Sequence, residues 1–310
     1  MRGRDLISVA DLSSSELDYV LTTAIALKDA GREPILAGKT LALVFEKPSL
    51  RTRVSFDVAM RHLGGECIYL SPPEVGLGER ETPADVGRVL SRYVDCIAAR
   101  VFEPETLTEL ADFADVPVIN ALSDPPLGEH PCQALADLQT VRENKGSLSG
   151  ITVTYVGDGN NVANSLCLAA ALSGMHFRIA SPPGYELEPT FVERGEGFAA
   201  ASGGSVTLTN DPRAAVEGAD VVYTDVWASM GQEREAALRK EAFQGYCVDG
   251  QMMALAKKDA IFMHDLPAHR GEEVADGVMD GPQSVVFDQA ENRMHAQKAV
   301  LALLLGEDIT

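Results

Sequence analysis

The chain has 310 residues, of which 45% are hydrophobic and 23% are charged, and its formal net charge is −20. This length allows two ordinary α/β domains or one large one. The acidic composition argues against nucleic acid or an anionic membrane as a partner, because such partners need a basic surface.

The cysteines and the start of the chain also exclude some classes of protein. Five cysteines form no Cys-x-x-Cys pair, so neither a disulfide framework nor a structural zinc site is expected. Cys132 is expected to pack in the core, since no base is indicated for it. No signal peptide is visible at the start, and the longest apolar stretches are too short to span a bilayer. These features predict a cytoplasmic location.

Strand-like runs alternate with amphipathic, helix-like patterns along most of the chain. Parallel strands need long crossover connections, so this alternation predicts parallel sheets covered by helices. Helices are expected to begin near Ser49, Pro83 and Pro104. The first of them is expected to bury Val54, Val58, Ala59 and Leu63. Strands are expected at 40–46, 66–71, 96–101, 116–121, 151–157, 176–181, 205–210, 220–226, 260–266 and 284–288.

A helix from His130 to about Asn144 separates the two series of strands. The predicted fold class is therefore α/β, with two doubly wound parallel-sheet domains joined by two connecting helices. The expected limits are 1–130 for the first domain, 131–145 for the connecting helix, 146–288 for the second domain, and 289–310 for a C-terminal helix that returns to the first domain.

Three cations, Lys47, Arg51 and Arg53, lie within the stretch EKPSLRTR at residues 46–53. Ser49 is a good N-cap for the helix that follows. A helix start offers free N–H groups and the positive end of the helix dipole, which together suit a phosphate group. Taken alone, the stretch is equally compatible with a capped surface helix that carries incidental arginines.

Polar and charged residues also follow the other predicted strands. Ligands bind beyond the carboxyl ends of the strands in open α/β sheets, so these residues are candidates for a site. Each has an ordinary explanation by itself, but so many at strand ends are difficult to assign to chance. The candidates are Arg100, the stretch His130 to Gln133, the stretch Asp158 to Asn161, Asp225 with Ser229, Met230 and Gly231, the stretch His264 to Arg270 with Asp265 and Leu266, and the stretch Glu291 to Arg293.

Several of these segments resemble those of the ornithine carbamoyltransferases. KPSLRTR is similar to the carbamoyl phosphate signature of that family, which usually reads Ser-Thr-Arg-Thr-Arg. Further similar segments follow in the family's order: HPCQALADLQT, GDGNNVANSL, TDVWASMGQE, LPAHRGEE and ENRMHAQKA. The resemblance runs from about residue 40 to residue 305, and the Ser-Met-Gly segment points to ornithine rather than aspartate.

The resemblance implies transfer of a carbamoyl group from carbamoyl phosphate to the δ-amine of L-ornithine, giving L-citrulline and phosphate. No metal or organic cofactor is implied, and the partners are these small substrates, without nucleic acid or membrane. The resemblance also implies a homotrimer or a multiple of trimers. Whether the enzyme serves arginine biosynthesis or the catabolic direction stays open.

For carbamoyl phosphate, the resemblance implies one set of groups in the first half of the chain and one arginine near its end. The groups at the phosphate would belong to Ser49, Leu50, Arg51 and Thr52. Arg100 and His130 would polarise the carbamoyl oxygen, and Gln133 would hold the carbamoyl amide. Arg293 would also face carbamoyl phosphate, whereas Arg53 would partly serve as a structural support.

For ornithine, the implied residues lie in the second half of the chain. Those that would hold the α-amino and α-carboxylate groups are Asn161, Asp225, Ser229 and Met230. Asp265 and Leu266, within segment 264–267, would frame the δ-amine.

The chain departs from the family pattern at three positions. Leu50 replaces the usual Thr of the signature, and Gly76 lies in a loop that often offers a polar side chain to a neighbouring subunit. Asp265 replaces the usual Cys of His-Cys-Leu-Pro. A carboxylate there would pair with the ammonium form of the δ-amine, so we expect tighter ground-state binding and an alkaline-shifted rate optimum. The alternative is that Asp265 points away from the site and changes little.

Other functions were weighed against carbamoyl transfer to ornithine. A nucleotide-dependent dehydrogenase fits poorly, because GDGNN lacks the later glycines and the next strand ends without an acidic residue for a ribose. Two alternatives stay open: a transferase that acts on another amine, such as putrescine or a modified ornithine, and a non-catalytic homologue that binds an anion.

Overall fold

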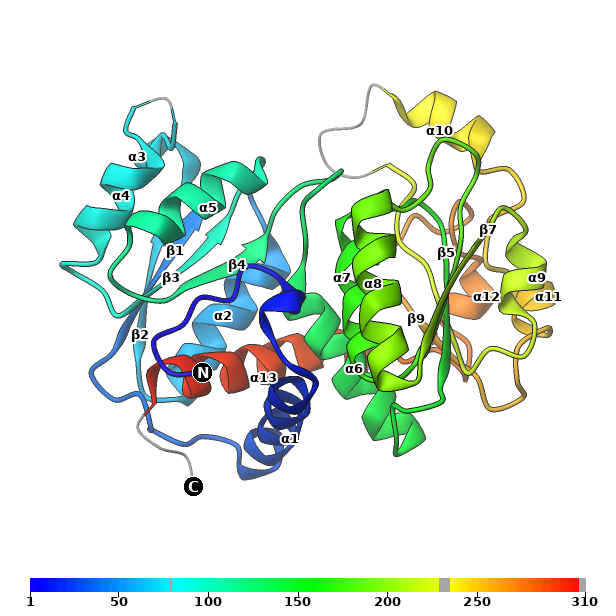
Figure 1. Ribbon diagram of the computed structural model, residues 1–310, viewed down its shortest axis with the longest axis horizontal. Coiled ribbons are helices and arrows are strands. Elements are labelled where there is room, and N and C mark those ends of the chain that lie inside the picture. The colour runs from blue at the N-terminus through cyan, green and yellow to red at the C-terminus, as the bar shows by residue number, and fades with distance from the viewer. Residues whose placement is uncertain (79, 229–234, 307–310) are drawn as a thin grey trace. The chain divides into compact units, whose positions relative to one another are not determined.

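A computed structural model of the chain describes residues 1–78, 80–228 and 235–306. The chain divides into two compact units, which Figure 1 shows in ribbon form. Unit 1 comprises Met1–Gln139 and Glu291–Thr310, and unit 2 comprises Thr140–Ala290. The chain leaves unit 1 within α6 (Pro131–Lys145) and returns to it within α13 (Val286–Leu305).

Unit 1 contains a four-stranded parallel sheet with the strand order β2-β1-β3-β4. The strands are β1 (Thr40–Phe45), β2 (Glu66–Leu70), β3 (Cys96–Arg100) and β4 (Val118–Leu122). The central strands β1 and β3 are almost wholly buried, as expected for apolar runs in a parallel sheet covered on both faces. The helices that precede α6 are η1 (Val9–Asp11), α1 (Ser14–Ala30), α2 (Leu50–His62), α3 (Pro72–Val75), α4 (Pro83–Leu90) and α5 (Pro104–Phe113).

Unit 2 contains a five-stranded parallel sheet with the strand order β7-β6-β5-β8-β9. The strands are β5 (Thr152–Val156), β6 (His176–Ala180), β7 (Ser205–Thr209), β8 (Val221–Tyr223) and β9 (Ile261–Met263). The helices are α7 (Asn161–Leu172), α8 (Pro189–Ser202), α9 (Pro212–Val216), α10 (Ala236–Ala242), α11 (Gly250–Met253) and α12 (Asp276–Met279). All twelve residues of α7 are buried, in keeping with its largely apolar sequence.

Each sheet has a topological switch point, where the strand order reverses. In unit 1 the reversal lies between β1 and β3, and in unit 2 it lies between β5 and β8. Ligands of doubly wound sheets bind beyond the carboxyl ends of the strands at such a point. A ligand is therefore expected at the segments that follow these four strands. The predicted class of two parallel-sheet α/β units is confirmed.

Nine of the ten predicted strands are confirmed within a few residues, but the strand predicted at 284–288 is wrong. Ser284 forms a single bridge to Phe262, and α13 begins at Val286. Val286 is buried whereas Phe287 is exposed, so the apolar run that suggested a strand is the first turn of a long helix.

The predicted buried face of α2 is only partly confirmed, because Ala59 and Leu63 are buried as expected but the two valines are not. Val54 is 49% exposed, and Val58 is partly exposed. The helix instead buries Thr52, Phe56, Ala59 and Met60, which share one face at the helical period of 3.6 residues. This register turns the Thr52 hydroxyl inward, although threonine is mostly an exposed residue.

None of the described helices combines the length and the apolar character that a membrane span requires.

Candidate active site

In unit 1, the start of α2 and the end of β3 meet at the hydroxyl group of Thr52. Ser49 caps α2, as predicted, and its Oγ accepts a hydrogen bond of 3.2 Å from the Thr52 N–H. The Thr52 Oγ1 accepts from Arg100 Nη1 at 3.3 Å and from Arg293 Nη2 at 2.7 Å. Residues from three distant parts of the sequence thus converge on one buried oxygen.

His130 lies beside this convergence and is buried. Its Nε2 is 3.5 Å from Arg293 Nη2. Burial lowers the pKa of His130 well below its ordinary value, and the charges of Arg293, Arg100, Lys47 and Arg51 lower it further. The imidazole is therefore neutral at neutral pH, and it can donate one hydrogen bond without adding a charge.

The neighbouring cations are only partly neutralised. Lys47 is buried, forms an ion pair with Asp124, and lies 5.5 Å from the ring centroid of Phe102. The buried Nε of Arg51 has no hydrogen-bond partner among the described residues. In a chain of net charge −20, this concentration of positive charge is suited to a small anion with more than one negative charge.

Two other residues of this segment have structural partners. The exposed Arg53 lies over the ring of Tyr69, 3.7 Å from its centroid, which fits the supporting role expected for it. Gln133 is buried and its Nε2 donates to Asp137 at 2.8 Å, which fixes the orientation of its amide. Its side-chain oxygen is therefore the atom left to face a donor on a ligand.

Two departures from the family pattern have a local explanation. Leu50 is the first residue of α2, and its side chain is 75% exposed, so its backbone N–H is the group that matters at the helix start. Gly76 ends α3 in the left-handed region with φ of 57°, and a Cβ there would lie 2.8 Å from the Cβ of Arg80. The backbone of this turn accounts for the glycine.

Cys132 is buried, and burial raises the pKa of its thiol to about 12. A neutral thiol is a poor nucleophile, so the expected packing role fits the structure.

In unit 2, the first turn of α7 is tied to the segment after β8 through Asn160. Asn160 caps α7, and its Oδ1 accepts from the N–H groups of Val162 and Ala163, both at 3.0 Å. This orientation turns its Nδ2 toward Asp225, whose Oδ2 accepts at 2.8 Å. Asn160 belongs to the candidate stretch after β5, but the resemblance assigned only Asn161 to ornithine, although an Asn just before an apolar helix is a cap signal. Asn161 itself is buried at the first position of α7.

A buried ion pair between Arg239 and Asp158 stabilises the same region. Arg239 Nη1 donates to Asp158 Oδ2 at 2.7 Å and to the backbone oxygen of Trp227 at 2.9 Å. Asp158 follows β5 and Trp227 follows β8, so this arginine links the two segments at the switch point.

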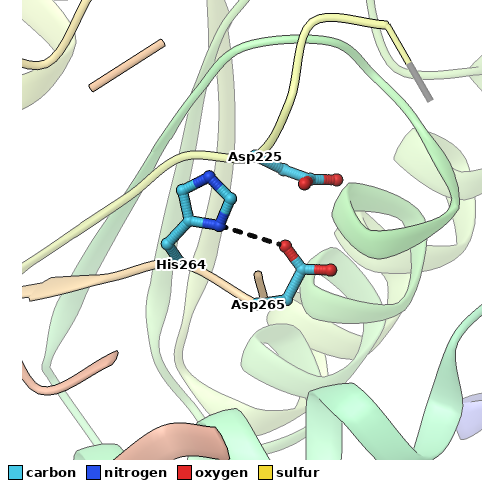
Figure 2. Close-up of side chains that lie close together, drawn as sticks. All are labelled: Asp225, His264 and Asp265. Carbon is cyan, nitrogen blue, oxygen red and sulfur yellow. Dashed lines mark ion pairs between the residues drawn. The ribbon is translucent and has the colours of Figure 1, made fainter. Parts of the chain in front are cut away.

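Asp225, His264 and Asp265 lie close together beyond β8 and β9 (Figure 2). One nitrogen or oxygen atom from each lies within 4.8 Å of the others. The Asp265 Oδ1 is 3.5 Å from His264 Nδ1. Burial raises the pKa of Asp225 well above its ordinary value, and the charge of Asp265 raises it further. Asp225 and Asp265, which the resemblance assigns to ornithine, therefore lie in one cluster, and the Asp265 side chain is directed toward it.

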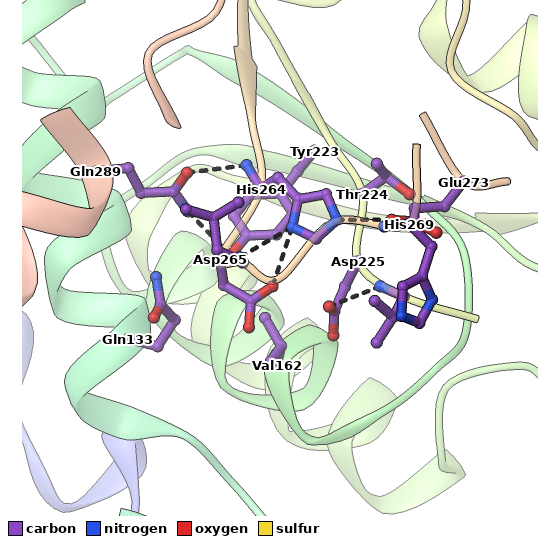
Figure 3. Close-up of polar contacts among 12 residues, drawn as sticks. Gln133, Val162, Tyr223, Thr224, Asp225, His264, Asp265, His269, Glu273 and Gln289 are labelled. Atoms are coloured by element: carbon purple, nitrogen blue, oxygen red, sulfur yellow. Dashed lines mark hydrogen bonds and ion pairs between the residues drawn. The ribbon is translucent and has the colours of Figure 1, made fainter. Parts of the chain in front are cut away.

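A network of hydrogen bonds orients His264 (Figure 3). Its Nε2 is 3.2 Å from Glu273 Oε1, its backbone N–H donates to Gln289 at 2.9 Å, and its Nδ1 accepts from the Leu266 N–H at 2.9 Å. Leu266 has φ of 63°, an uncommon value for a residue other than glycine. Glu273 and Gln289 were missed by the sequence analysis, because isolated polar residues in loops and helix starts carry no periodic signal.

Among the described residues, two groups bring histidine and carboxylate atoms close enough to consider a metal: Asp225, His264 and Asp265, and His269, Glu272 and Glu273. Both ring nitrogens of His264 already have partners, and Glu273 already accepts from the His269 N–H. Hydrogen bonding thus accounts for both groups, and we assign no metal to either. Ser229 and Met230, which were also predicted to bind ornithine, lie outside the described residues.

The sequence matches the two domains of one protein family. Residues 4–143 match the aspartate/ornithine carbamoyltransferase carbamoyl-P binding domain, and residues 149–304 match the Asp/Orn binding domain.

Similar proteins cover nearly the whole chain. The ornithine carbamoyltransferase of Pyrococcus abyssi is 54% identical over 310 residues, which cover 99% of this chain and 97% of that protein. The protein of Pyrococcus furiosus named "Ornithine carbamoyltransferase, anabolic" is 53% identical over 99% of this chain and 98% of its own. A solved structure of ornithine carbamoyltransferase from Pyrococcus furiosus superimposes with a TM-score of 0.94, at 53% identity, over 98% of this chain and 97% of that one. The resemblance seen in the sequence is thereby confirmed, and the chain belongs to the ornithine carbamoyltransferases, within the aspartate/ornithine carbamoyltransferase family of transferases.

Proposed function

We propose that the chain transfers the carbamoyl group of carbamoyl phosphate to the δ-amine of L-ornithine, giving L-citrulline and phosphate in arginine biosynthesis. The observation that supports this most strongly is the cation cluster of unit 1, where Arg51, Arg100 and Arg293 gather around a neutral His130. Carbamoyl phosphate is a dianion with a polar carbonyl group, and it needs both kinds of donor.

The phosphate group binds at the start of α2. The first N–H groups of the helix, including that of Leu50, carry the positive end of the dipole. The Ser49 and Thr52 hydroxyls and the Arg51 guanidinium complete the phosphate site, with Arg51 able to make two parallel hydrogen bonds.

The carbamoyl group binds beside Arg100, His130 and Gln133. Negative charge develops on the carbonyl oxygen as the carbon becomes tetrahedral, and donors held in place stabilise it. Arg100 and His130 supply these donors, and the side-chain oxygen of Gln133 accepts from the carbamoyl amide. Arg293 positions Arg100 indirectly, because both guanidinium groups donate to Thr52.

Ornithine binds to unit 2. Asn161 and Asp225 hold the amino-acid end, together with Ser229 and Met230, whose assignment comes from the resemblance. Asp265 and the backbone of Leu266 frame the δ-amine. An alkylamine has a pKa near about 10.4, so its ammonium form must lose a proton before it attacks.

The remaining features are proposed from the resemblance. Residues 1–130 form the carbamoyl phosphate domain, 131–145 the connecting helix, 146–288 the ornithine domain, and 289–310 the helix that returns to the first domain. The enzyme works without a metal or an organic cofactor, in the cytoplasm, as a homotrimer or a multiple of trimers. It has no nucleic-acid or membrane partner.

Acceptor screening tests this function. Purified protein is given carbamoyl phosphate with L-ornithine, putrescine, L-lysine or L-aspartate, and the carbamoylated products are separated and measured. We expect product with ornithine and at least about tenfold less with each other amine, since an unfilled polar pocket costs on the order of 1–3 kcal/mol. A preference for putrescine would contradict ornithine as the acceptor, and no product with any amine would contradict catalysis.

A further inference from the structure

The cluster at the end of β8 and β9 contains two carboxyl groups that lie close together. Asp225 and Asp265 face one another in Figure 2, and atoms of both lie within 4.8 Å of His264 and of each other. Asp225 is 5% exposed, and the Asp265 side chain is 11% exposed. Two buried carboxyl groups this close do not both ionise readily, because like charges repel strongly where water is excluded.

The hydrogen bonds of Asp225 show where a proton can lie. Its Oδ2 accepts from Asn160 and its Oδ1 accepts from the Val226 N–H at 2.7 Å. Both oxygens of Asp225 therefore already accept hydrogen bonds, and neither donor can become an acceptor. A proton on Asp265 can be shared with the Asp225 oxygen that lies near it, whereas two carboxylates would lie close together without a proton between them.

We propose that Asp225 and Asp265 hold one proton between them in the ligand-free protein, and that the δ-ammonium group of ornithine displaces this proton to solvent and then gives one of its own to the pair. This inference depends on the proposed carbamoyl transfer. It makes Asp265, which stands where the family usually has Cys, a catalytic residue of this chain.

The proton balance closes over one turnover. The resting pair holds one proton, and it loses that proton to solvent when the ammonium group binds. The doubly charged pair then takes a proton from the ammonium group and returns to its resting state, leaving a neutral amine. The amine nitrogen forms a bond to the carbamoyl carbon, and the bond from that carbon to the phosphate oxygen breaks. One of the two protons on the nitrogen leaves with phosphate, and the other stays in citrulline. A pair of carboxylates is a stronger base than one, because its second charge is unfavourable.

The surrounding groups set the charge that the pair experiences. Tyr155 lies near both carboxyl groups, and burial together with Asp225, Asp265 and Asp158 raises its pKa well above the ordinary value, so it stays neutral. Asp158 is paired with Arg239.

His264 is the one neighbour that could take the proton instead. Burial lowers the pKa of His264, and hydrogen bonds to Asp265 and Glu273 would raise it to about 9 if Nδ1 carried a proton toward Asp265. The Leu266 N–H opposes the charged ring, because it donates to Nδ1, the nitrogen nearest Asp265. The geometry therefore keeps the ring proton on Nε2, next to Glu273.

Infrared spectroscopy of the ligand-free protein tests the inference without substrate. A protonated carboxyl group gives a C=O stretching band that shifts in D₂O, and we expect Asp265→Asn and Asp225→Asn each to lose one such band at neutral pH. The matched control is Asp220→Asn, which removes a buried carboxylate of the same unit that is paired with Lys257 and should leave the band intact. A band that persists in both pair variants, or a protonated His264 Nδ1 in nitrogen NMR, would overturn the proposal.

Proton release on binding is the second test. Calorimetry of L-ornithine binding, with inorganic phosphate present and in buffers of different ionisation enthalpy, should show release of about one proton per ornithine bound. L-Norvaline, which has the same carbon chain and α-amino group but lacks the δ-amine, should release none, and Asp265→Asn should release none with ornithine. No release from the unmodified protein would contradict the inference. Citrulline formation is measured separately, so a failure of the pair would be distinguished from a failure of the proposed function.

Discussion

The two units place opposite charges at equivalent positions of similar sheets. In unit 1, the segments beyond β1 and β3 bring cations around a histidine that burial keeps neutral. In unit 2, the segments beyond β8 and β9 bring two carboxyl groups together, and burial with like charge raises the pKa of Asp225. In each site, burial and repulsion between like charges shift the pKa of one group toward its neutral form. That group is His130 in unit 1 and Asp225 in unit 2.

This difference shows how one chain can bind a dianion and a cation despite a net charge of −20. The long-range field repels carbamoyl phosphate, so unit 1 needs a local excess of donors close to the bound group. The long-range negative field attracts ornithine as a cation. Unit 2 therefore needs side chains that fix where a proton lies more than it needs additional charge.

The largest effect is expected from the donors of unit 1. Arg100→Ala and His130→Ala should each lower kcat by about 10²–10³, because each removes a donor to the developing oxyanion. Steady-state kinetics gives the loss, and circular dichroism of each variant checks that the fold is intact. Unchanged turnover in both variants would remove the basis for placing the carbamoyl group in unit 1.

A smaller effect is expected at the hydroxyl that organises those donors. Thr52→Val keeps the shape of the side chain but leaves Arg100 and Arg293 without their shared acceptor, so the KM for carbamoyl phosphate should rise about tenfold. Thr52→Ser is the matched control, since it keeps the hydroxyl group. A KM that Thr52→Val leaves unchanged, or that Thr52→Ser raises by as much, would mean that the hydroxyl does not organise these donors.

Replacing Asp265 in unit 2 should change how the rate depends on pH. In Asp265→Cys the thiol stays neutral and Asp225 has no proton to exchange, so ornithine no longer competes with a proton for the site. The acidic limb of kcat/KM for ornithine should therefore move to lower pH by about one unit. Most of the change should lie in KM, and a profile that does not move would refute the alkaline-shifted optimum expected from the sequence.

The smallest effect concerns the stability of unit 1 in acid. The pKa of His130 is depressed in the folded protein, while the unfolded chain takes up a proton near the ordinary value of 6.5. Below that pH the unfolded state binds more protons, so the free energy of unfolding should fall by up to about 1.4 kcal/mol per pH unit. His130→Gln should remove this part of the slope in denaturant titrations, whereas His62→Gln, at a partly exposed position, should change the slope less. Equal slopes for the unmodified protein and His130→Gln would mean that His130 is already charged.

The strands and the first catalytic segment were predictable because they carry periodic or local signals. Apolar runs gave nine strands, and Ser49 before a helical pattern gave the cap of α2. Arg100, His130 and Arg293 were found through family motifs, not through any local rule.

The contacts among these residues could not be predicted in the same way. Thr52 and Arg293 are 241 positions apart, and their hydrogen bond depends on how α13 packs in unit 1. The roles of Asn160, Glu273 and Gln289 depend likewise on loops that meet after folding. The misplaced buried face of α2 has the same cause, because two valines fixed the predicted register while Phe56 and Met60 fixed the real one.

Binding of carbamoyl phosphate to the purified protein tests the central claim most directly. Titration calorimetry should detect one site per chain, and Arg51→Ala should weaken that site by on the order of tenfold or more, because it removes a charged partner of the phosphate. If carbamoyl phosphate produces no heat with the unmodified protein, or binds equally well without the Arg51 guanidinium, the dianion does not bind at the start of α2 and the account is contradicted.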